Sequence, residues 1–213
     1  MSYTDIIWDW NGTLVDDVAV SVDCVNDIFT QYNMPHTTVE EYLSVITPSL
    51  EDYYGRYFDM TRHTMTELLS LFQKYYSQRA NRLKLMNGAI DALHRLKIMG
   101  KRQYIVSSFE QSALENSVDM LGVRQYFDII SGCDDIHCGS KSERARRIVQ
   151  SAEKAVLLGD SICDYITATE AGCDCILIAS GHQQKSDLLS CKPKNGCTVA
   201  VFDNIPAAVN AIM

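Results

Sequence analysis

The sequence of 213 residues contains no uninterrupted apolar run that approaches the roughly 18 residues of a membrane-spanning helix. Its first residues also lack the basic segment followed by a long apolar stretch that is typical of a secretory signal peptide. We therefore expect a cytoplasmic protein with no membrane partner.

Positive charge is also scarce in this chain. It has 19 Lys and Arg residues against 27 Asp and Glu residues, which gives a formal net charge of −8. General nucleic-acid binding needs a basic surface, so this balance argues against a nucleic-acid partner. Because 46% of the residues are hydrophobic and 22% are charged, the composition is that of an ordinary globular protein.

Paired C-x-x-C motifs are missing, although the chain has eight cysteines. Their absence argues against a structural zinc site of the usual spacing. In a reducing compartment a free cysteine behaves as a small hydrophobic residue. We therefore interpret these cysteines as buried or partly buried thiols.

Six short apolar runs alternate along the chain with segments of helical periodicity. The runs cover residues 6–8, 104–106, 127–130, 155–158, 175–178 and 198–201. They are nearly continuous rather than alternating, which is typical of parallel strands that are covered on both faces. The alternation of strands and helices predicts an α/β fold, a doubly wound parallel sheet with a Rossmann-like core.

One long segment near the N-terminus shows helical patterns only. Apolar residues recur at helical spacing from Val18 to Phe29, from Tyr53 to Phe58 and from Leu68 to Tyr76. A connection this long between two strands is not one simple helix. We predict a core domain of residues 1–15 and 84–213, interrupted by an all-helical cap domain of residues 16–83 over the carboxyl edge of the sheet.

Polar residues of particular types follow four of the predicted strands. They are Asp9 and Asn11, then Ser107 and Ser108, then Lys141 at the start of a helix, and then Asp160 with Asp164. Because the carboxyl ends of parallel strands converge on one crevice, these residues should meet there. Taken singly, each has an ordinary explanation as a helix cap, a turn residue or a surface charge. We predict that the nearby Arg144, Arg146 and Arg147 form a solvated face.

The predicted crevice has the chemistry of a phosphoryl site. Asp9 and Asp160 can both stay ionised in one pocket only if a cation lies between them. A few hard oxygen ligands suit Mg²⁺, which keeps waters and a substrate phosphate in its shell. Lys141 offers a positive charge and Ser107 a hydroxyl, while Asp9 at the end of a buried strand is placed as a nucleophile.

The order of these motifs resembles that of the haloacid dehalogenase-like hydrolase superfamily. Asp9-Trp10-Asn11-Gly12-Thr13-Leu14 is similar to the first motif of that family, and Gly159-Asp160-Ser161 with Asp164 is similar to the fourth. Ser107 and Lys141 match the second and third motifs. The stretch from Leu85 to Leu93 and the helical insertion are similar to the phosphoglycolate phosphatase-like branch.

The resemblance implies a role for each matched residue. Asp9 would attack phosphorus and become an aspartyl-phosphate. Mg²⁺ would be held by Asp9, the backbone carbonyl of Asn11 and Asp160, with Asp164 supporting the metal or its waters. The transferring phosphoryl group would be bound by Thr13, Ser107, Ser108 and Lys141.

Asn11 departs from the family pattern, which usually has a second Asp at this position as general acid and base. An amide has no titrating proton near neutral pH. General acid–base catalysis is typically worth about 10²–10⁴-fold, so we expect slower turnover of alkyl phosphates. The substrate could have a good leaving group, such as an acyl phosphate or an anhydride. Another group, such as His36, His63 or His182, could supply the proton, or turnover could be lost while binding is kept.

The prediction that follows is a Mg²⁺-dependent phosphatase of small phosphorylated metabolites, slowed or specialised by Asn11. The main alternative is a catalytically weak or inactive phosphate-binding or regulatory protein on the same fold. Carbon–halogen hydrolysis also uses an aspartate nucleophile but needs no metal, so the second carboxylate at Asp160 argues against it. The sequence predicts neither the substrate nor the oligomeric state.

Overall fold

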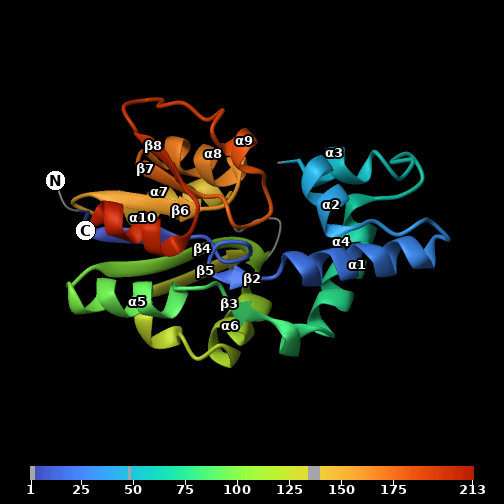
Figure 1. The fold of residues 1–213 in the computed structure, drawn as a ribbon, viewed down its shortest axis with the longest axis horizontal. Coiled ribbons are helices and arrows are strands. Elements are labelled where there is room, and N and C mark those ends of the chain that lie inside the picture. Colours follow the sequence, from blue (N-terminus) through green and yellow to red (C-terminus); the bar gives the residue numbers. More distant parts are fainter. Residues whose placement is uncertain (1–2, 48, 134–139) are drawn as a thin grey trace. The chain divides into compact units, whose positions relative to one another are not determined.

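The computed structural model describes residues 3–47, 49–133 and 140–213. Its centre is a six-stranded parallel sheet in the order β5-β4-β1-β6-β7-β8 (Figure 1). The strands are β1 (Asp5–Trp8), β4 (Arg102–Glu110), β5 (Ile129–Cys133), β6 (Ala155–Gly159), β7 (Asp174–Ile178) and β8 (Val199–Phe202). The predicted α/β fold is confirmed, and each of the six apolar runs overlaps one strand.

Helices cover both faces of this sheet. They are α5 (Ala89–Ile98), α6 (Gln111–Met120), α7 (Lys141–Val149), α8 (Ile162–Ala171), α9 (Lys185–Leu188) and α10 (Ile205–Ile212), with a short 3₁₀ helix η2 (Arg124–Tyr126). Helices α7 and α8 pack together on one face, while α5 and α10 contact each other on the other (Figure 1). This double cover explains why the central strands β1 and β6 are apolar apart from Asp5 at the start of β1.

The two central strands carry the buried core. Every residue of β1 and of β6 is buried, and Ile7 pairs with Leu157 in the parallel register of the two strands. Side chains from α7 and α8, including Ala145 and Ala168, pack against Ile7 and Leu157. On the opposite face, Trp8 donates through Nε1 to Gln103, whose amide in turn donates to the Leu93 carbonyl of α5. The carboxyl ends of β1 and β6 are therefore held side by side.

The chain divides into two compact units. One unit comprises Met1–Asp16 with Lys84–Met213, and the other comprises Asp17–Leu83. The first contains a small antiparallel ladder, not predicted from the sequence, of β2 (Val15–Asp16) and β3 (Lys84–Leu85). This ladder joins the two segments of the first unit where the chain leaves it and returns. We call the first the core unit and the second the helical unit.

The helical unit contains four α-helices and one 3₁₀ helix among its described residues. They are α1 (Val18–Gln31), α2 (Val39–Val45), α3 (Leu50–Tyr54), α4 (Met65–Ser77) and η1 (Ala80–Arg82). Aromatic side chains form much of its core, with Phe29 in ring contact with Tyr57 and Phe58. Helix α3 ends at Tyr54, so Tyr57 and Phe58 lie beyond the helix that their spacing predicted and still pack inward.

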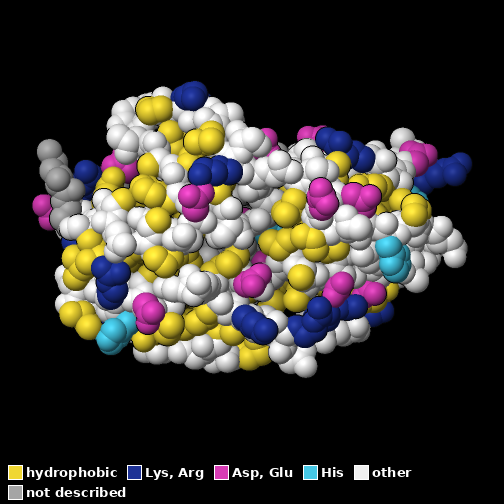
Figure 2. Space-filling model, viewed as in Figure 1, with side chains coloured by type: hydrophobic (Ala, Val, Ile, Leu, Met, Phe, Trp, Pro, Cys, Tyr) yellow, Lys and Arg dark blue, Asp and Glu magenta, His cyan; other side chains and the backbone are white. Residues whose placement is uncertain are grey.

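No helix within the described residues is both long and apolar enough to cross a membrane. On the face drawn in Figure 2, the Lys and Arg side chains are interspersed with Asp and Glu side chains rather than gathered by sign.

Candidate active site

Three acidic side chains meet at the carboxyl end of the central strands. Asp9 directly follows β1, and its backbone N–H donates to the Leu158 carbonyl of β6 at 2.8 Å. Asp160 directly follows β6, and Asp164 lies in the first turn of α8. Carboxylate oxygens of the three residues lie within 4.8 Å of one another, and all three residues are buried. The sequence-based expectation that Asp9 and Asp160 share a pocket thus agrees with this geometry.

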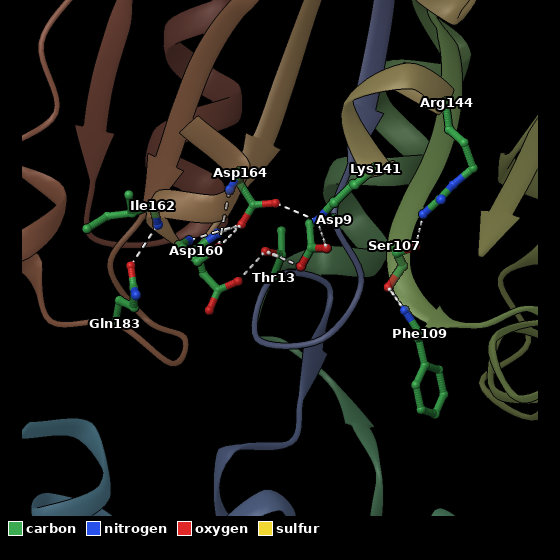
Figure 3. Close-up of polar contacts among 11 residues, drawn as sticks. Asp9, Thr13, Ser107, Phe109, Lys141, Arg144, Asp160, Ile162, Asp164 and Gln183 are labelled. Atoms are coloured by element: carbon green, nitrogen blue, oxygen red, sulfur yellow. Dashed lines mark hydrogen bonds and ion pairs between the residues drawn. The ribbon is translucent and has the colours of Figure 1, made fainter. Parts of the chain in front are cut away.

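Lys141 reaches this acidic group from the first position of α7. Its Nζ lies 2.5 Å from Asp9 Oδ1 and 2.6 Å from Asp164 Oδ1, and its side chain is 12% exposed (Figure 3). Ser140 places it there by capping α7 in a reciprocal pair with Glu143. One ammonium group therefore bridges two of the three carboxylates.

The loop after β1 places the Thr13 hydroxyl between the carboxylates of Asp9 and Asp160. The backbone N–H groups of Thr13, Leu14 and Val15 all point to the Trp10 carbonyl, which closes the chain into a tight turn. From this turn Thr13 Oγ1 lies 3.3 Å from Asp9 Oδ2 and 3.0 Å from Asp160 Oδ1. Thr13 is fully buried, so its hydroxyl links the two side chains away from solvent.

Asp164 is engaged by several donors at the start of α8. Its Oδ2 accepts from the backbone N–H groups of Asp160 and Ser161 and from the Ser161 hydroxyl at 2.6 Å. Ser161 in turn caps the helix by accepting from the Asp164 backbone N–H. The other Asp164 oxygen, Oδ1, accepts from Lys141 Nζ. Asp164 therefore fixes both the turn after β6 and the position of the lysine.

Two glycines allow the backbone to approach Asp160 closely. A Cβ built on Gly12, whose φ is +74°, would lie 2.3 Å from Asp160 Oδ2 and 2.5 Å from His182 Cδ2. A Cβ on Gly181 would lie 2.2 Å from the same carboxylate oxygen. The His182 backbone N–H also donates to Asp160 Oδ2 at 2.7 Å. The loops after β1 and β7 therefore both touch Asp160, and the His182 ring lies against the loop that carries Asn11.

Ser107 lies near the end of β4, the strand beside β1, in a network of its own. Its hydroxyl accepts from the Phe109 backbone N–H at 3.1 Å, and its carbonyl accepts from Arg144 Nη2 at 2.6 Å (Figure 3). Arg144 is only 8% exposed, so the expectation that it belongs to a solvated face is wrong. It lies one helical turn after Lys141 on α7, where the two side chains share a face. Ser108 points away from the core and is exposed.

Burial and like charges act together on the acidic side chains. Burial, opposed by Lys141 and reinforced by Asp164 and Asp160, raises the pKa of Asp9 to about 7. Burial also raises the pKa of Asp160 to about 6, although His182 and Thr13 oppose the shift. The pKa of Lys141 is raised, because attraction to Asp164 and Asp9 outweighs its burial. The site thus has a deficit of positive charge that a cation would correct.

Comparisons with known proteins agree with this geometry. The family model described as haloacid dehalogenase-like hydrolase matches residues 6–178. A pyrophosphatase PpaX from Bacillus mycoides strain KBAB4 is 19% identical over 199 residues, which covers 91% of each chain. A pyrophosphatase PpaX from Bacillus cereus strain Q1 is 20% identical over 178 residues, which covers 81% of each chain.

Solved structures show the same fold over the whole chain. A haloacid dehalogenase-like family hydrolase from Streptococcus pneumoniae superposes with a TM-score of 0.82 at 22% identity, covering 98% of this chain and 97% of the other. A "predicted phosphoglycolate phosphatase" from Haemophilus somnus 129pt superposes with a TM-score of 0.78 at 18% identity, covering 100% and 99%. Together with the matched motifs, these findings show that the chain belongs to the haloacid dehalogenase-like hydrolase family.

Proposed function

We propose that this protein is a Mg²⁺-dependent phosphatase of small phosphorylated metabolites that works through an aspartyl-phosphate on Asp9. The observation that carries the proposal is the placement of Asp9, which lies within 4.8 Å of two further carboxylates and forms an ion pair with Lys141. A buried carboxylate at a strand end beside a fixed positive charge is suited to attack phosphorus. Names of the relatives, pyrophosphatase and phosphoglycolate phosphatase, support a phosphorylated substrate.

The donor set fits a magnesium ion. Asp9 and Asp160 offer hard carboxylate oxygens from neighbouring strands, and burial raises the pKa of each, so a bound cation would favour their ionised forms. We assign the ion to Asp9, Asp160 and the Asn11 backbone carbonyl. Because Asp164 Oδ2 already accepts from two backbone N–H groups and from the Ser161 hydroxyl, we assign Asp164 to supporting the metal or its waters. When bound, Mg²⁺ would supply positive charge for the phosphoryl group.

We assign the remaining roles on the same basis. Lys141 would hold Asp9 and balance its charge, and with Ser107 it would bind the transferring phosphoryl group. Thr13 would orient Asp9 through its hydroxyl. Ser108, which is exposed near the end of β4, would bind substrate. We further propose that the helical unit is a cap that selects the metabolite and that the protein works in the cytoplasm.

Trapping the phosphoenzyme tests this proposal. The protein is mixed with Mg²⁺ and ³²P-labelled acetyl phosphate, quenched in acid and counted for protein-bound label that hydroxylamine releases. We expect label on the wild type and none on Asp9→Asn, because the amide is not a nucleophile. We also expect the label to persist during an unlabelled chase, because Asn11 cannot activate water.

Two controls complete the experiment. Asp91→Asn removes a carboxylate that is exposed on α5 and should label like the wild type. A chelator should abolish labelling, which also distinguishes the proposal from metal-free carbon–halogen hydrolysis. Absence of label in the wild type, or equal label in Asp9→Asn, would refute the proposed function and favour a phosphate-binding protein.

A further inference from the structure

The loop between β7 and α9, residues 179–184, lies against the turn after β6 that carries Asp160. Two consecutive residues of this loop make the contact. The His182 backbone N–H donates to Asp160 Oδ2 at 2.7 Å. Gln183 Oε1 accepts from the Ile162 backbone N–H, also at 2.7 Å (Figure 3). The two hydrogen bonds run in opposite directions between the same two segments, so they join the loop and the turn at two points.

Ile162 is the first residue of α8, where a backbone N–H has no acceptor within the helix. The neighbouring N–H groups are satisfied locally. Ser161 accepts from the Asp164 N–H, and the Asp164 side chain accepts from the N–H groups of Asp160 and Ser161. The Ile162 N–H instead donates to a side chain 21 positions away. The start of α8 is therefore fixed by another loop as well as by its own cap.

The Gln183 side chain is buried, with 6% of the residue exposed. Burying an amide costs free energy unless the amide is hydrogen-bonded. The bond to Ile162 offsets this cost, which a nonpolar side chain of similar length would not incur. The contribution of Gln183 to the structure is therefore a directed hydrogen bond and not packing alone.

Asp160 is held by donors from separate parts of the chain. Its Oδ1 lies 3.0 Å from the Thr13 hydroxyl, and its Oδ2 accepts from His182. The His182 N–H is only as well placed as the loop that carries it. Gln183 is the next residue, and it ties this loop to Ile162, two residues beyond Asp160. The Gln183 bond therefore fixes the His182 N–H relative to the backbone of Asp160 itself.

We infer that Gln183 is a positioning residue for the cation site, which holds Asp160 in the orientation that binds Mg²⁺ and so sets the affinity for the ion. This inference rests on the proposed function, in which Asp160 is a ligand of the metal. Residues that orient the ligands of a metal commonly change its affinity by about 10–100-fold. Because Gln183 acts through His182 and the start of α8, we expect an effect near the lower end of that range.

The neutral charge of Gln183 supplies a rescue variant. Glutamate at this position would still accept from the Ile162 N–H, and a negative charge is favourable at the start of a helix. It would also add a fourth carboxylate near Asp9, Asp160 and Asp164. The hydrogen bond and the charge can therefore be tested separately.

Metal affinity measured without turnover tests the inference. Gln183→Met keeps the length of the side chain and removes the acceptor. We expect it to raise the Kd for Mg²⁺ by about 10-fold. Electron paramagnetic resonance of free Mn²⁺ would give the Kd for Mn²⁺, and competition would give that for Mg²⁺. Circular dichroism and thermal melting would establish that the variant is folded at the temperature of the titration.

Gln184→Met is the matched control, since Gln184 is the next residue, is exposed and makes no side-chain cap to α9. It should bind Mg²⁺ as the wild type does. Gln183→Glu should recover most of the affinity that Gln183→Met loses. The double variant Gln183→Met with Gln184→Glu adds the same charge without the acceptor and should not recover it.

Hydrogen exchange of the Ile162 amide, followed by NMR in the metal-free protein, reports the bond itself. It should be faster in Gln183→Met than in the wild type and in Gln183→Glu, because the amide loses its acceptor. This measurement distinguishes a local loss of position from a general loss of stability, which would speed exchange throughout the core.

Three results would overturn the inference. One is the same Mg²⁺ affinity in the wild type and in folded Gln183→Met. Another is full recovery in the double variant, because charge alone would then set the affinity. The third is Ile162 exchange that does not change in Gln183→Met. A wild type that binds no Mg²⁺ would refute the proposed metal dependence as well, whereas a wild type that binds Mg²⁺ and forms the phosphoenzyme would leave the proposed function standing when the inference fails.

Discussion

Arg144 shows how one buried charge can shape a site without touching its acidic centre. Its guanidinium donates to the Ser107 carbonyl at 2.6 Å, and the side chain is 8% exposed. A hydrogen bond from a charged donor holds that carbonyl more firmly than a neutral donor would. Because the Ser107 hydroxyl and carbonyl belong to the same residue, we propose that Arg144 is a positioning residue for the serine.

We expect Arg144→Met to lower the free energy of unfolding by about 1.5–3 kcal/mol, the usual range for losing a hydrogen bond to a charged group. The substitution keeps the length of the side chain but leaves the Ser107 carbonyl without this donor. It should also weaken inhibition by inorganic phosphate. Urea unfolding and phosphate inhibition constants would measure the two effects.

Arg147→Met is the matched control, since Arg147 is exposed on the same helix. It should change stability by less than about 0.5 kcal/mol, as surface substitutions usually do. If Arg147→Met changed the free energy of unfolding and phosphate inhibition as much as Arg144→Met does, the contribution of Arg144 would come from its positive charge alone and not from its hydrogen bond to Ser107.

At the scale of elements, the site depends on two loops that approach one carboxylate. Gly12, in the loop after β1, and Gly181, in the loop after β7, each leave room that Asp160 fills. Gly12 also has a φ of +74°, a conformation that side chains other than glycine adopt at a cost. The loops therefore require glycine for two separate reasons, space and backbone conformation.

Comparing Gly12→Ala with Gly100→Ala separates the cost of lost space from the cost of the backbone conformation. Gly100 has a φ of +72° but nothing within 4 Å of its Cβ position. We expect Gly100→Ala to cost about 1 kcal/mol for the backbone alone and to keep full activity. Gly12→Ala should cost about 1–3 kcal/mol more, because its Cβ meets Asp160. Denaturant midpoints and Mg²⁺ titrations would show the difference.

Gly181→Ala supplies the third comparison, because its Cβ would meet Asp160 without the penalty of a positive φ. It should weaken the response to Mg²⁺ as Gly12→Ala does. If all three variants behaved alike, close approach to Asp160 would not matter for the site.

Across the whole molecule, burying three carboxylates with one lysine creates a charge imbalance that folding must tolerate. The folded-state pKa of Asp9, about 7, and of Asp160, about 6, both lie above the ordinary aspartate value near 3.9. Between these values the folded state binds more protons than the unfolded state. Stability from these two groups is therefore complete below about pH 4 and is lost as the pH rises through 6 and 7.

We predict that the metal-free protein melts at a lower temperature at pH 8 than at pH 5.5. Mg²⁺ should raise the melting temperature more at pH 8, because it binds the ionised carboxylates and stabilises only the folded state. Differential scanning calorimetry with and without Mg²⁺ would measure this. In Asp160→Asn both the pH dependence and the Mg²⁺ effect should shrink; a Mg²⁺ effect of the same size at the two pH values would contradict the assignment.

The sequence predicted the sheet well and the details of the connections poorly. Continuous apolar runs identified all six strands of the main sheet, because strands buried on both faces have few polar positions. The ladder of Val15–Asp16 with Lys84–Leu85 was not predicted, since two residues are too short for a periodic signal. The end of α3 at Tyr54 was also missed, because aromatic residues beyond a helix can pack as well as those within it.

The sequence by itself determined the fold class, the family and the candidate residues, because these depend on residue type and order along the chain. Only the tertiary structure decided that Lys141 bridges Asp9 and Asp164, that Thr13 links Asp9 to Asp160, and that Arg144 is buried. These contacts join residues up to 147 positions apart. They depend on strand order and on the reach of side chains, which spacing along the chain does not specify.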